Sequence, residues 1–325
     1  MSGFLTSDNS YLSRPNPGLV PGSAGDCTDL PAAVAGFVRA SLADNTRRAY
    51  LSDLRHFEHW GGRIPASAET VASYLAAHVD TLRVATLVRR IASISKAHQA
   101  RGVPNPTRSE LVRTTLRGIK RKRRCTQQQA KALLREDLLL VLDTMGDDLK
   151  DIRDRALLLI GFAGALRRSE LVALDVVDIV PVRRGIWLQL RRSKTDQDGR
   201  GDKIAIPYGR SRRCPVLALD AWLTASGITE GAIFRPVDRH GHVHGGRLSG
   251  EAVSIVVRER VAAAGLDPIG YSGHSLRAGF ATSAAQAGVQ VWRIKAQTRH
   301  ASDAMLARYI REGELFRDNA AGALL

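Results

Sequence analysis

The sequence predicts a mainly α-helical protein of two domains, with a small antiparallel β-sheet in the second domain. The chain has 325 residues, enough for two domains that each bury a hydrophobic core. Apolar residues recur at helical spacing from residue 29 to about residue 115, as at Tyr50, Leu54 and Phe57. The main strand-like runs lie within residues 176–206. The first domain is therefore expected to be wholly helical, and the second domain mixed.

The charge of the chain favours a polyanionic partner. Its formal net charge is +16 at pH 7, and its isoelectric point is near 10.5. Such an excess of positive charge supplies nonspecific affinity for nucleic acid. The sequence has no apolar run of about 18 residues and no basic-then-apolar signal peptide. We therefore expect a soluble, intracellular protein that binds nucleic acid rather than a membrane protein.

The N-terminal part is expected to contain a tail and a helical domain. Residues 1–26 are rich in Ser, Pro, Gly and Asn, which is typical of a mobile tail. Residues 27–120 are expected to fold as a compact domain of four or five helices, with Ser67 as one helix cap. A Gly-Gly pair and Pro65 favour a turn before that cap.

A basic segment follows, in which residues 101–124 contain nine Lys or Arg residues and one acidic residue, Glu110. Such a run forms either a solvated face or a surface that follows a nucleic-acid backbone. It leads into a Gln-rich stretch, so we favour a basic and polar linker, residues 121–134, that lies along DNA. The candidate DNA-binding residues are Arg117, Lys120, Arg121, Lys122, Arg123 and Arg124.

The second domain is expected at residues 135–325. A turn at residues 167–171, with the sequence R-R-S-E-L, follows a long helical pattern, and its charges are spaced for a local salt bridge. A polar loop at residues 193–201 would join two strands as a long hairpin. Strands are expected at residues 176–180, 185–190 and 203–207.

Three histidines and three cysteines raise the question of metal binding. His240, His242 and His244 alternate along a predicted strand, which would place their imidazoles on one face. They either share a metal ion or simply lie on that face; we favour the second interpretation, because neither a carboxylate nor a Cys is expected beside them. The cysteines are far apart without a C-x-x-C motif, so neither a disulfide framework nor a zinc site is expected. They are Cys27, Cys125 and Cys214.

The last fifth of the chain concentrates groups that bind or attack a phosphate. Ser275 precedes an apolar periodic run, so a helix is expected to begin there. Three-residue spacing then places His274 and Arg277 on one face of its first turn. A second amphipathic helix would carry Tyr309, nine positions after His300. Each residue alone has an ordinary structural explanation, but their grouping favours a functional site.

This grouping resembles the catalytic end of the tyrosine site-specific recombinases, the phage-type integrases and Cre-like enzymes. The family motif G-H-x-x-R is matched at residues 273–277, and His300 and Tyr309 match the groups that follow it. The R-x-S-E-L motif of the family is matched at residues 167–171. One departure is Arg299, where many members have Gly.

The resemblance covers roughly residues 28–317 and implies a fold. Residues 45–57 have the sequence pattern N-T-R-R-A-Y-x-x-D-L-x-x-F. This pattern is similar to part of the helical, SAM-like core-binding domain of these enzymes. The C-terminal domain would then have the DNA breaking-rejoining enzyme fold. Together the two domains would form a C-shaped clamp.

The resemblance also implies how a phosphate would be held. It selects Arg167, rather than Arg168, together with Arg277 as the guanidiniums that neutralise the nonbridging oxygens. His300 would add a hydrogen bond to the same phosphate.

The implied chemistry is a transesterification. Tyr309 would attack the phosphate and form a 3′-phosphotyrosyl link, so no ATP, metal or other cofactor is expected. Lys194, in the hairpin loop, would protonate the 5′-hydroxyl leaving group. His274 would either accept the tyrosine proton or orient the cluster. Glu170 would support His274 or an arginine from behind.

The implied partner is double-stranded DNA, bound by a homotetramer on two sites, with an accessory DNA-bending protein as a further candidate. The location expected for such a protein is the cytoplasm, in association with the nucleoid. The segment after Tyr309, which contains Leu315 and Phe316, either folds back onto its own domain or packs as a helix on the next protomer. The resemblance favours packing on the next protomer.

Three other functions fit part of these observations. A type IB topoisomerase would use the same chemistry to relax DNA as a monomer, and a DNA-binding regulator would keep the fold with a decayed site. A metal nuclease would use the three strand histidines. Because none of the expected catalytic groups is missing, the sequence favours the recombinase.

Overall fold

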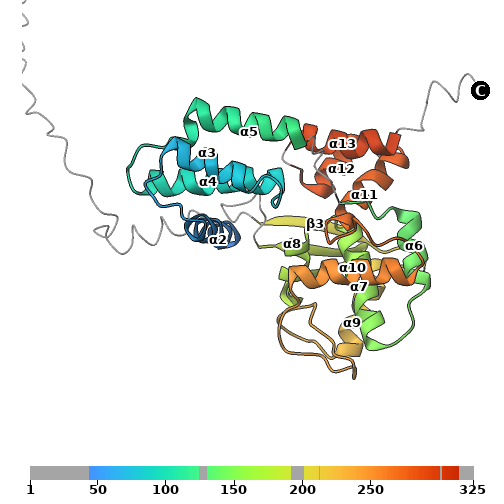
Figure 1. Ribbon diagram of the computed structural model, residues 1–325. Helices are drawn as coiled ribbons and strands as arrows, with labels where there is room; N and C mark the ends of the chain where they lie inside the picture. The colour runs from blue at the N-terminus through green and yellow to red at the C-terminus, as the bar shows by residue number, and fades with distance from the viewer. Residues whose placement is uncertain (1–43, 124–129, 192–200, 212, 301, 315–325) are drawn as a thin grey trace, which may run out of the picture. The chain divides into compact units, whose positions relative to one another are not determined.

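Figure 1 shows the computed structural model, which describes residues 44–123, 130–191, 201–211, 213–300 and 302–314. The chain divides into two compact units, Met1–Gln127 and Gln128–Leu325. The expected mainly helical fold with a small antiparallel sheet is confirmed. Within the described ranges, no helix combines the length and the apolar character needed to cross a membrane. The predicted tail, residues 1–26, lies outside these ranges.

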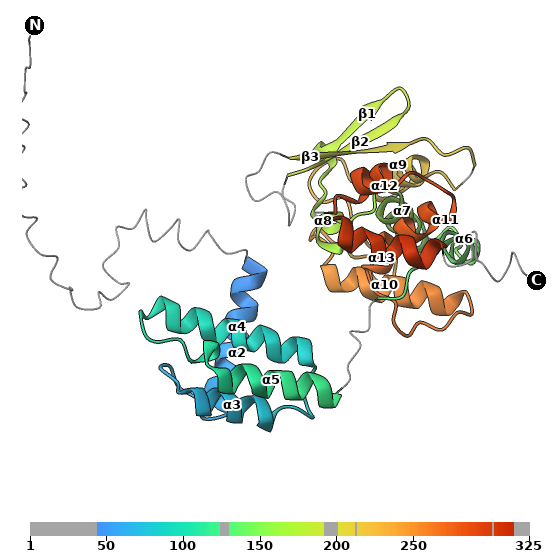
Figure 2. The ribbon, with the colours of Figure 1, turned by 90° about the horizontal axis from the view of Figure 1, so that it is seen from above.

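The described part of the first unit is a bundle of helices (Figure 2). Its apolar core includes Phe57, Tyr74 and Leu87, whose exposed fraction is zero. Ser67 caps a helix as predicted, because its Oγ accepts a hydrogen bond from the Thr70 N–H at 3.2 Å. The elements are α2 (Asp44–His59), α3 (Ala68–Ala77), α4 (Val84–Ala100), the 3₁₀ turn η2 (Pro106–Arg108) and α5 (Glu110–Arg123).

A polar network joins α2, α3 and α4 inside this bundle. The buried Asp53 carboxylate accepts two hydrogen bonds from the Arg89 guanidinium, at 2.9 and 2.8 Å. Arg90 donates to the Tyr74 hydroxyl at 2.7 Å, and its Nη1 lies 2.7 Å from His56 Nδ1. Burial, and then the charge of Arg90, lower the pKa of His56, so its neutral ring can accept that hydrogen bond. The network therefore constrains how three helices pack.

Helix α5 carries most of the candidate DNA-binding residues. Arg117 forms an ion pair with Glu110 at 3.2 Å on the exposed surface, and Arg124 lies outside the described residues. The division between the two units falls inside the predicted linker, residues 121–134, although α5 continues to Arg123. The last turn of α5 holds Lys120, Arg121, Lys122 and Arg123.

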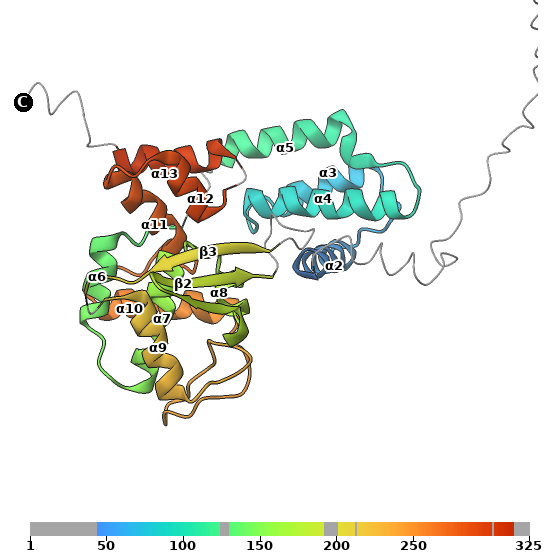
Figure 3. The ribbon, with the colours of Figure 1, turned by 180° about the vertical axis from the view of Figure 1, so that it is seen from behind.

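The second unit contains helices and one small sheet (Figure 3). Its helices before the sheet are α6 (Arg135–Asp143), α7 (Leu149–Ala163), α8 (Arg168–Ala173) and the 3₁₀ turn η3 (Val176–Asp178). The strands are β1 (Ile179–Val182), β2 (Gly185–Leu190) and β3 (Asp202–Pro207). The later helices are α9 (Pro215–Ser226), α10 (Gly250–Ala263), α11 (Ser275–Gln286), α12 (Val291–Thr298) and α13 (Asp303–Glu314).

The sheet is antiparallel in the order β1-β2-β3, and Ile186 pairs with Ile206 across the last two strands. Side chains alternate as the strand period requires, because Ile186 and Leu188 are buried whereas Trp187 is exposed. The first expected strand begins later than predicted, since Val176–Asp178 forms a 3₁₀ turn closed by the Asp178 N–H donating to Asp175 O. The loop between β2 and β3 includes Lys194, which lies outside the described residues.

The expected strand with three aligned histidines does not form. Only an isolated bridge between Val237 and Val243 is present, and the chain turns back between these two residues. Asp238 makes the turn, because its Oδ1 accepts hydrogen bonds from the N–H groups of His240 and His242 at 2.8 and 2.9 Å. The expectation that no carboxylate lies beside the histidines was therefore wrong. Even so, the described residues contain no group of three or more His, Cys, Asp or Glu placed to hold a metal ion.

Helix α11 is the central element of the second unit, because it contacts α6, α7, α12 and α13. Two glycines permit this close packing. A Cβ atom at Gly161 of α7 would come within 2.7 Å of Leu276 Cδ1. A Cβ atom at Gly279 of α11 would overlap the backbone carbonyl of Leu133, whose N–H donates to Ser275 O at 3.0 Å. The segment before α6 is thus held against the backbone of α11.

We predict that Gly279→Ala lowers the free energy of unfolding by at least ~1–3 kcal/mol, because the new methyl group must displace backbone. Gly118→Ala in α5 is the matched control, since a Cβ there meets nothing within 4 Å. It should raise stability by about 0.5–1 kcal/mol through helix propensity. Urea unfolding followed by circular dichroism measures both changes. Equal effects of the two substitutions would contradict the packing.

Candidate active site

The turn before α11 places the G-H-x-x-R segment. The Gly273 N–H donates to Ser254 Oγ at 3.1 Å, and a Cβ atom at Gly273 would lie 2.9 Å from Arg168 Cβ. Glycine is therefore required by close packing. The Ser272 N–H donates to Ser275 Oγ at 2.9 Å, which closes the turn. His274 follows as the first residue before the helix.

Tyr309 reaches this turn from α13. The Tyr309 hydroxyl lies 3.0 Å from His274 Nε2, within hydrogen-bond distance. Helix α13 packs against α11, where Leu306 joins an apolar cluster with Ala281 and Ala285. The ring of His300 lies 5.7 Å from the Tyr309 ring, centre to centre. The structure thus brings the two histidines and the tyrosine together.

Arg277 is a buried cation at the same place, with an exposed fraction of 1%. Its Nη1 donates to the Ala165 carbonyl at 2.8 Å, and its buried Nη2 has no hydrogen-bond partner among the described residues. Burial, followed by the charge of Arg167, lowers the pKa of Arg277 to about 10. A buried guanidinium with an unused donor is suited to bind an anion.

Arg167 lies at the start of α8 and pairs with Glu170. Its Nη1 donates to Glu170 Oε1 at 2.6 Å, and its backbone N–H donates to Glu170 Oε2 at 2.9 Å. Arg168 instead lies 3.4 Å from Glu251, and its side chain is 53% exposed. Of these two neighbouring arginines, Arg167 is therefore the one that faces the cluster. This geometry supports the R-x-S-E-L register.

Sequence reasoning missed two parts of the site, Ala165 and the side chain of Arg299. Both have positive φ angles, +45° and +53°, and they are the only non-glycine residues of the described ranges that do. Such a conformation costs about 1–2 kcal/mol in an ordinary residue, and strain of this kind clusters at functional sites. The sequence had marked Arg299 only as a departure from Gly. No local signal identified Ala165, whose carbonyl accepts from Arg277.

Both histidines of the site are neutral near pH 7. Burial, then the charges of Arg277 and Arg167, lowers the pKa of His300 to about 4. The same three causes lower the pKa of His274. Neutral imidazoles can accept a proton, which a cationic ring cannot do.

The tautomer of His300 follows from its neighbour Thr298. Thr298 Oγ1 donates its single proton to Ile294 O at 2.8 Å, and His300 Nδ1 lies 2.8 Å from the same oxygen. We therefore assign the ring proton to Nδ1, which leaves Nε2 as the acceptor.

The structure thus gathers six of the residues selected from the sequence, and the seventh, Lys194, lies outside the described residues. The charges of the arginines act on both histidines, and Glu170 contacts Arg167. The six are Arg167, Glu170, His274, Arg277, His300 and Tyr309.

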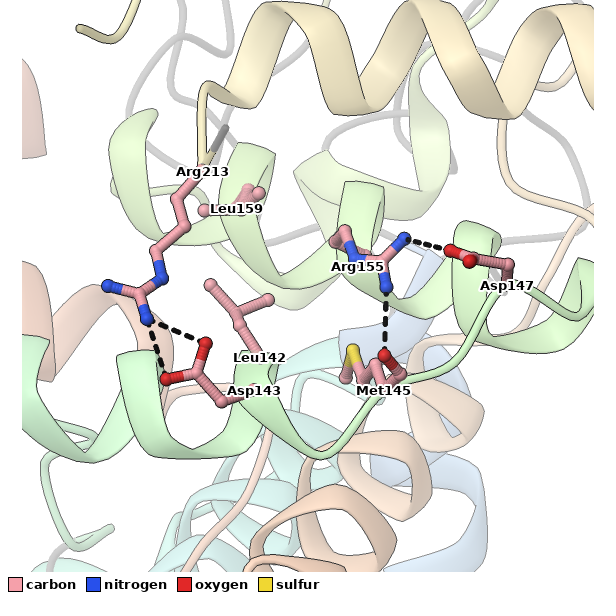
Figure 4. Close-up of a pocket in the computed structure, with 7 residues that line it drawn as sticks. All are labelled: Leu142, Asp143, Met145, Asp147, Arg155, Leu159 and Arg213. Atoms are coloured by element: carbon pink, nitrogen blue, oxygen red, sulfur yellow. Dashed lines mark hydrogen bonds and ion pairs between the residues drawn. The ribbon is translucent and has the colours of Figure 1, made fainter. Parts of the chain in front are cut away.

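A hollow elsewhere in the second unit has no comparable chemistry (Figure 4). It encloses about 440 Å³ between α6, α7 and the start of α9. Its arginines already have carboxylate partners, because Arg213 pairs with Asp143 at 2.6 Å and Arg155 lies 3.7 Å from Asp147. The six-residue cluster remains the stronger candidate.

The chain is similar to known proteins over most of its length. Residues 123–314 match the phage integrase family. An integrase/recombinase XerD homolog of Selenomonas ruminantium is 40% identical over 290 residues, which cover 86% of this chain and 85% of the relative. The Cre recombinase of Escherichia phage P1 is 26% identical over 312 residues, 88% of each chain. Among solved structures, a lambda integrase tetramer bound to a Holliday junction shares the fold, with a TM-score of 0.61 at 17% identity; the match covers 90% of this chain and 81% of that one.

We predict that His300 makes stability depend on pH. Its pKa is about 4 in the folded state, against an ordinary histidine value of 6.5, so the unfolded chain binds the proton more tightly. The stabilisation is complete above pH 6.5 and is lost as the pH falls towards 4, by up to about 3 kcal/mol. Urea unfolding at several pH values in this window should therefore show a shallower slope for His300→Gln. The exposed His240→Gln is the control for loss of one imidazole, and an unchanged slope in His300→Gln would refute the assignment.

Proposed function

This chain belongs to the phage integrase family, and from that membership we propose how its own side chains cut and rejoin DNA. The protein is a tyrosine recombinase. The observation that carries the proposal is the 3.0 Å contact between the Tyr309 hydroxyl and His274 Nε2, beside the buried guanidinium of Arg277. A nucleophile, a neutral base and a cation are then available at one place.

In the proposed reaction, the Tyr309 oxygen attacks the scissile phosphorus and gives its proton to His274. A 3′-phosphotyrosyl bond forms as the bond from phosphorus to the 5′-oxygen breaks. The phosphodiester bond energy is retained in the new ester, so rejoining needs no ATP. Because its pKa is lowered, His274 is neutral before the reaction, and its Nε2 lies 3.0 Å from the hydroxyl, where it can take the proton; we therefore assign it the role of base.

Arg277 and Arg167 would neutralise the nonbridging oxygens of the phosphate. The unused Nη2 donor of Arg277 and the placement of Arg167 beside it support this role. His300 would hydrogen-bond to the phosphate through Nε2. Since we assign its ring proton to Nδ1, this bond requires the ring to take up a second proton as the phosphate arrives, which the negative charge of the phosphate favours.

Lys194 is proposed as the general acid that protonates the 5′-oxygen. Its support is the family resemblance and its place in the loop between β2 and β3. A Lys194→Ala variant should therefore recover its cleavage rate on a substrate whose 5′-leaving group is a thiol, because a thiolate leaves without a proton.

Double-stranded DNA is the proposed partner, with a homotetramer on two sites as the active assembly. The net charge of +16 and the basic last turn of α5 support DNA binding. The related lambda integrase was solved as a tetramer bound to a Holliday junction, which supports the assembly. Sedimentation of the protein with a preformed four-way junction tests it, because four subunits per junction are expected.

We predict that Tyr309→Phe binds DNA as the wild type does but forms no covalent adduct. The substrate can be a pool of nicked duplexes with randomised sequence, from which adducts are recovered after denaturation. Tyr208→Phe is the control, because Tyr208 is an exposed tyrosine of the same unit and lies outside the cluster. Adduct formed by Tyr309→Phe would remove Tyr309 from the mechanism.

We also predict opposite outcomes for two neighbouring arginines. Arg167→Ala should slow cleavage by about 10²–10³, because a contact made to the transition state is worth roughly 3–4 kcal/mol. Arg168→Ala should retain most of the cleavage rate, since its side chain lies towards Glu251. Single-turnover adduct formation on a selected duplex measures both rates. If Arg168→Ala were the slower variant, the assigned register would be wrong.

A further inference from the structure

Arg299 ends α12 in a conformation that favours glycine. Its φ and ψ are +53° and +44°, and its N–H donates to Lys295 O at 2.7 Å. A glycine would adopt this left-handed turn without steric cost, whereas the Cβ atom of an arginine comes too close to the backbone there. The side chain of Arg299 is therefore expected to make a contact that offsets the strain.

That contact is a buried ion pair with Glu170. Arg299 Nη2 lies 2.6 Å from Glu170 Oε2, and the two side chains are 9% and 2% exposed. The other carboxylate oxygen, Oε1, accepts from the Arg167 guanidinium at 2.6 Å. One carboxylate is thus shared by two guanidiniums from segments that are far apart in the sequence.

Because Glu170 pairs with both arginines, Arg167 is held less tightly. A buried carboxylate with a single guanidinium partner holds that partner strongly, because neither charge can be solvated. With Arg299 on the other oxygen, Glu170 is paired even when Arg167 turns a donor towards an anion, and the three groups retain one net positive charge. A second carboxylate near Arg299 is less tightly bound, since Asp202 Oδ2 is 3.8 Å from Nε and the Asp202 side chain is 40% exposed.

We propose that Arg299 is a positioning residue for DNA cleavage, which pairs with Glu170 and thereby leaves Arg167 available to the scissile phosphate. This inference rests on the proposed function of Arg167. The arginine at position 299, where many family members have Gly, then acts on the phosphate site through Glu170.

The test begins with Arg299→Asn, because Asn tolerates the left-handed conformation but carries no charge. Adduct formation on a duplex selected with the wild type should slow by about 10- to 100-fold, because the Glu170 carboxylate then holds Arg167 alone. Arg293→Asn makes the same change of charge on the exposed part of α12 and should leave the rate unchanged. Arg299→Gly, which relieves the strain as well, should slow cleavage to the same extent and serves if the Asn variant does not fold.

A second substitution separates positioning from net charge. Glu170→Gln in the Arg299→Asn background removes the carboxylate that holds Arg167. The double variant should therefore cleave at least tenfold faster than Arg299→Asn alone. Asp202→Asn in that background restores the same net charge but leaves Arg167 paired, so it should restore little. If Asp202→Asn rescues as well as Glu170→Gln, or if Arg299→Asn cleaves at the wild-type rate, the proposal is overturned.

A measurement without DNA distinguishes this proposal from the proposed function. Inorganic phosphate, titrated against each variant and followed by ³¹P NMR, should bind more weakly to Arg299→Asn and recover with Glu170→Gln. Absence of any adduct with wild-type protein would refute the proposed function, while the phosphate titration would still decide the role of Arg299. Equal phosphate affinity in wild type and Arg299→Asn would overturn that role.

Discussion

The second unit depends on one electrostatic constraint: three guanidiniums lie around a single buried carboxylate. Arg167 and Arg299 both pair with Glu170, and the charges of both act on Arg277. Each buried cation must be compensated by hydrogen bonds or by an anion, because desolvation of an isolated charge is costly. The excess of positive charge therefore favours binding of an anion. Burial, together with this charge, lowers the pKa of both neighbouring histidines and keeps them neutral.

Holding such charges in place requires a rigid support, which α11 provides. The close approach of Leu133 to Gly279, and of Leu276 to Gly161, leaves this helix little freedom to shift. Arg277 is on its first turns, and the carbonyl that accepts from Arg277 belongs to Ala165, a strained residue before α8. Packing of the apolar core thus stabilises backbone strain and charge that would be unfavourable alone.

The sequence predicted the helical and sheet architecture and the residues with recognisable spacing. His274 and Arg277 could be found because they lie three positions apart at the start of one helix, and Tyr309 because it lies nine positions after His300, as the family pattern requires. The pairing of Arg299 with Glu170 could not be predicted, since it joins segments that only tertiary folding brings together. The three histidines were misassigned to a strand because an Asp238 side chain competes locally with strand pairing.

The shared carboxylate also constrains how residues of this site can change during evolution. Glu170 and Arg299 lie 129 residues apart, yet loss of Glu170 removes the close carboxylate partner of Arg299, and loss of Arg299 leaves Glu170 held by Arg167 alone. Single substitutions at one position are then disfavoured unless the second has already changed. Descendants of this chain should replace the two residues together, so that statistical covariation between distant columns of an alignment would record a contact made inside one active site.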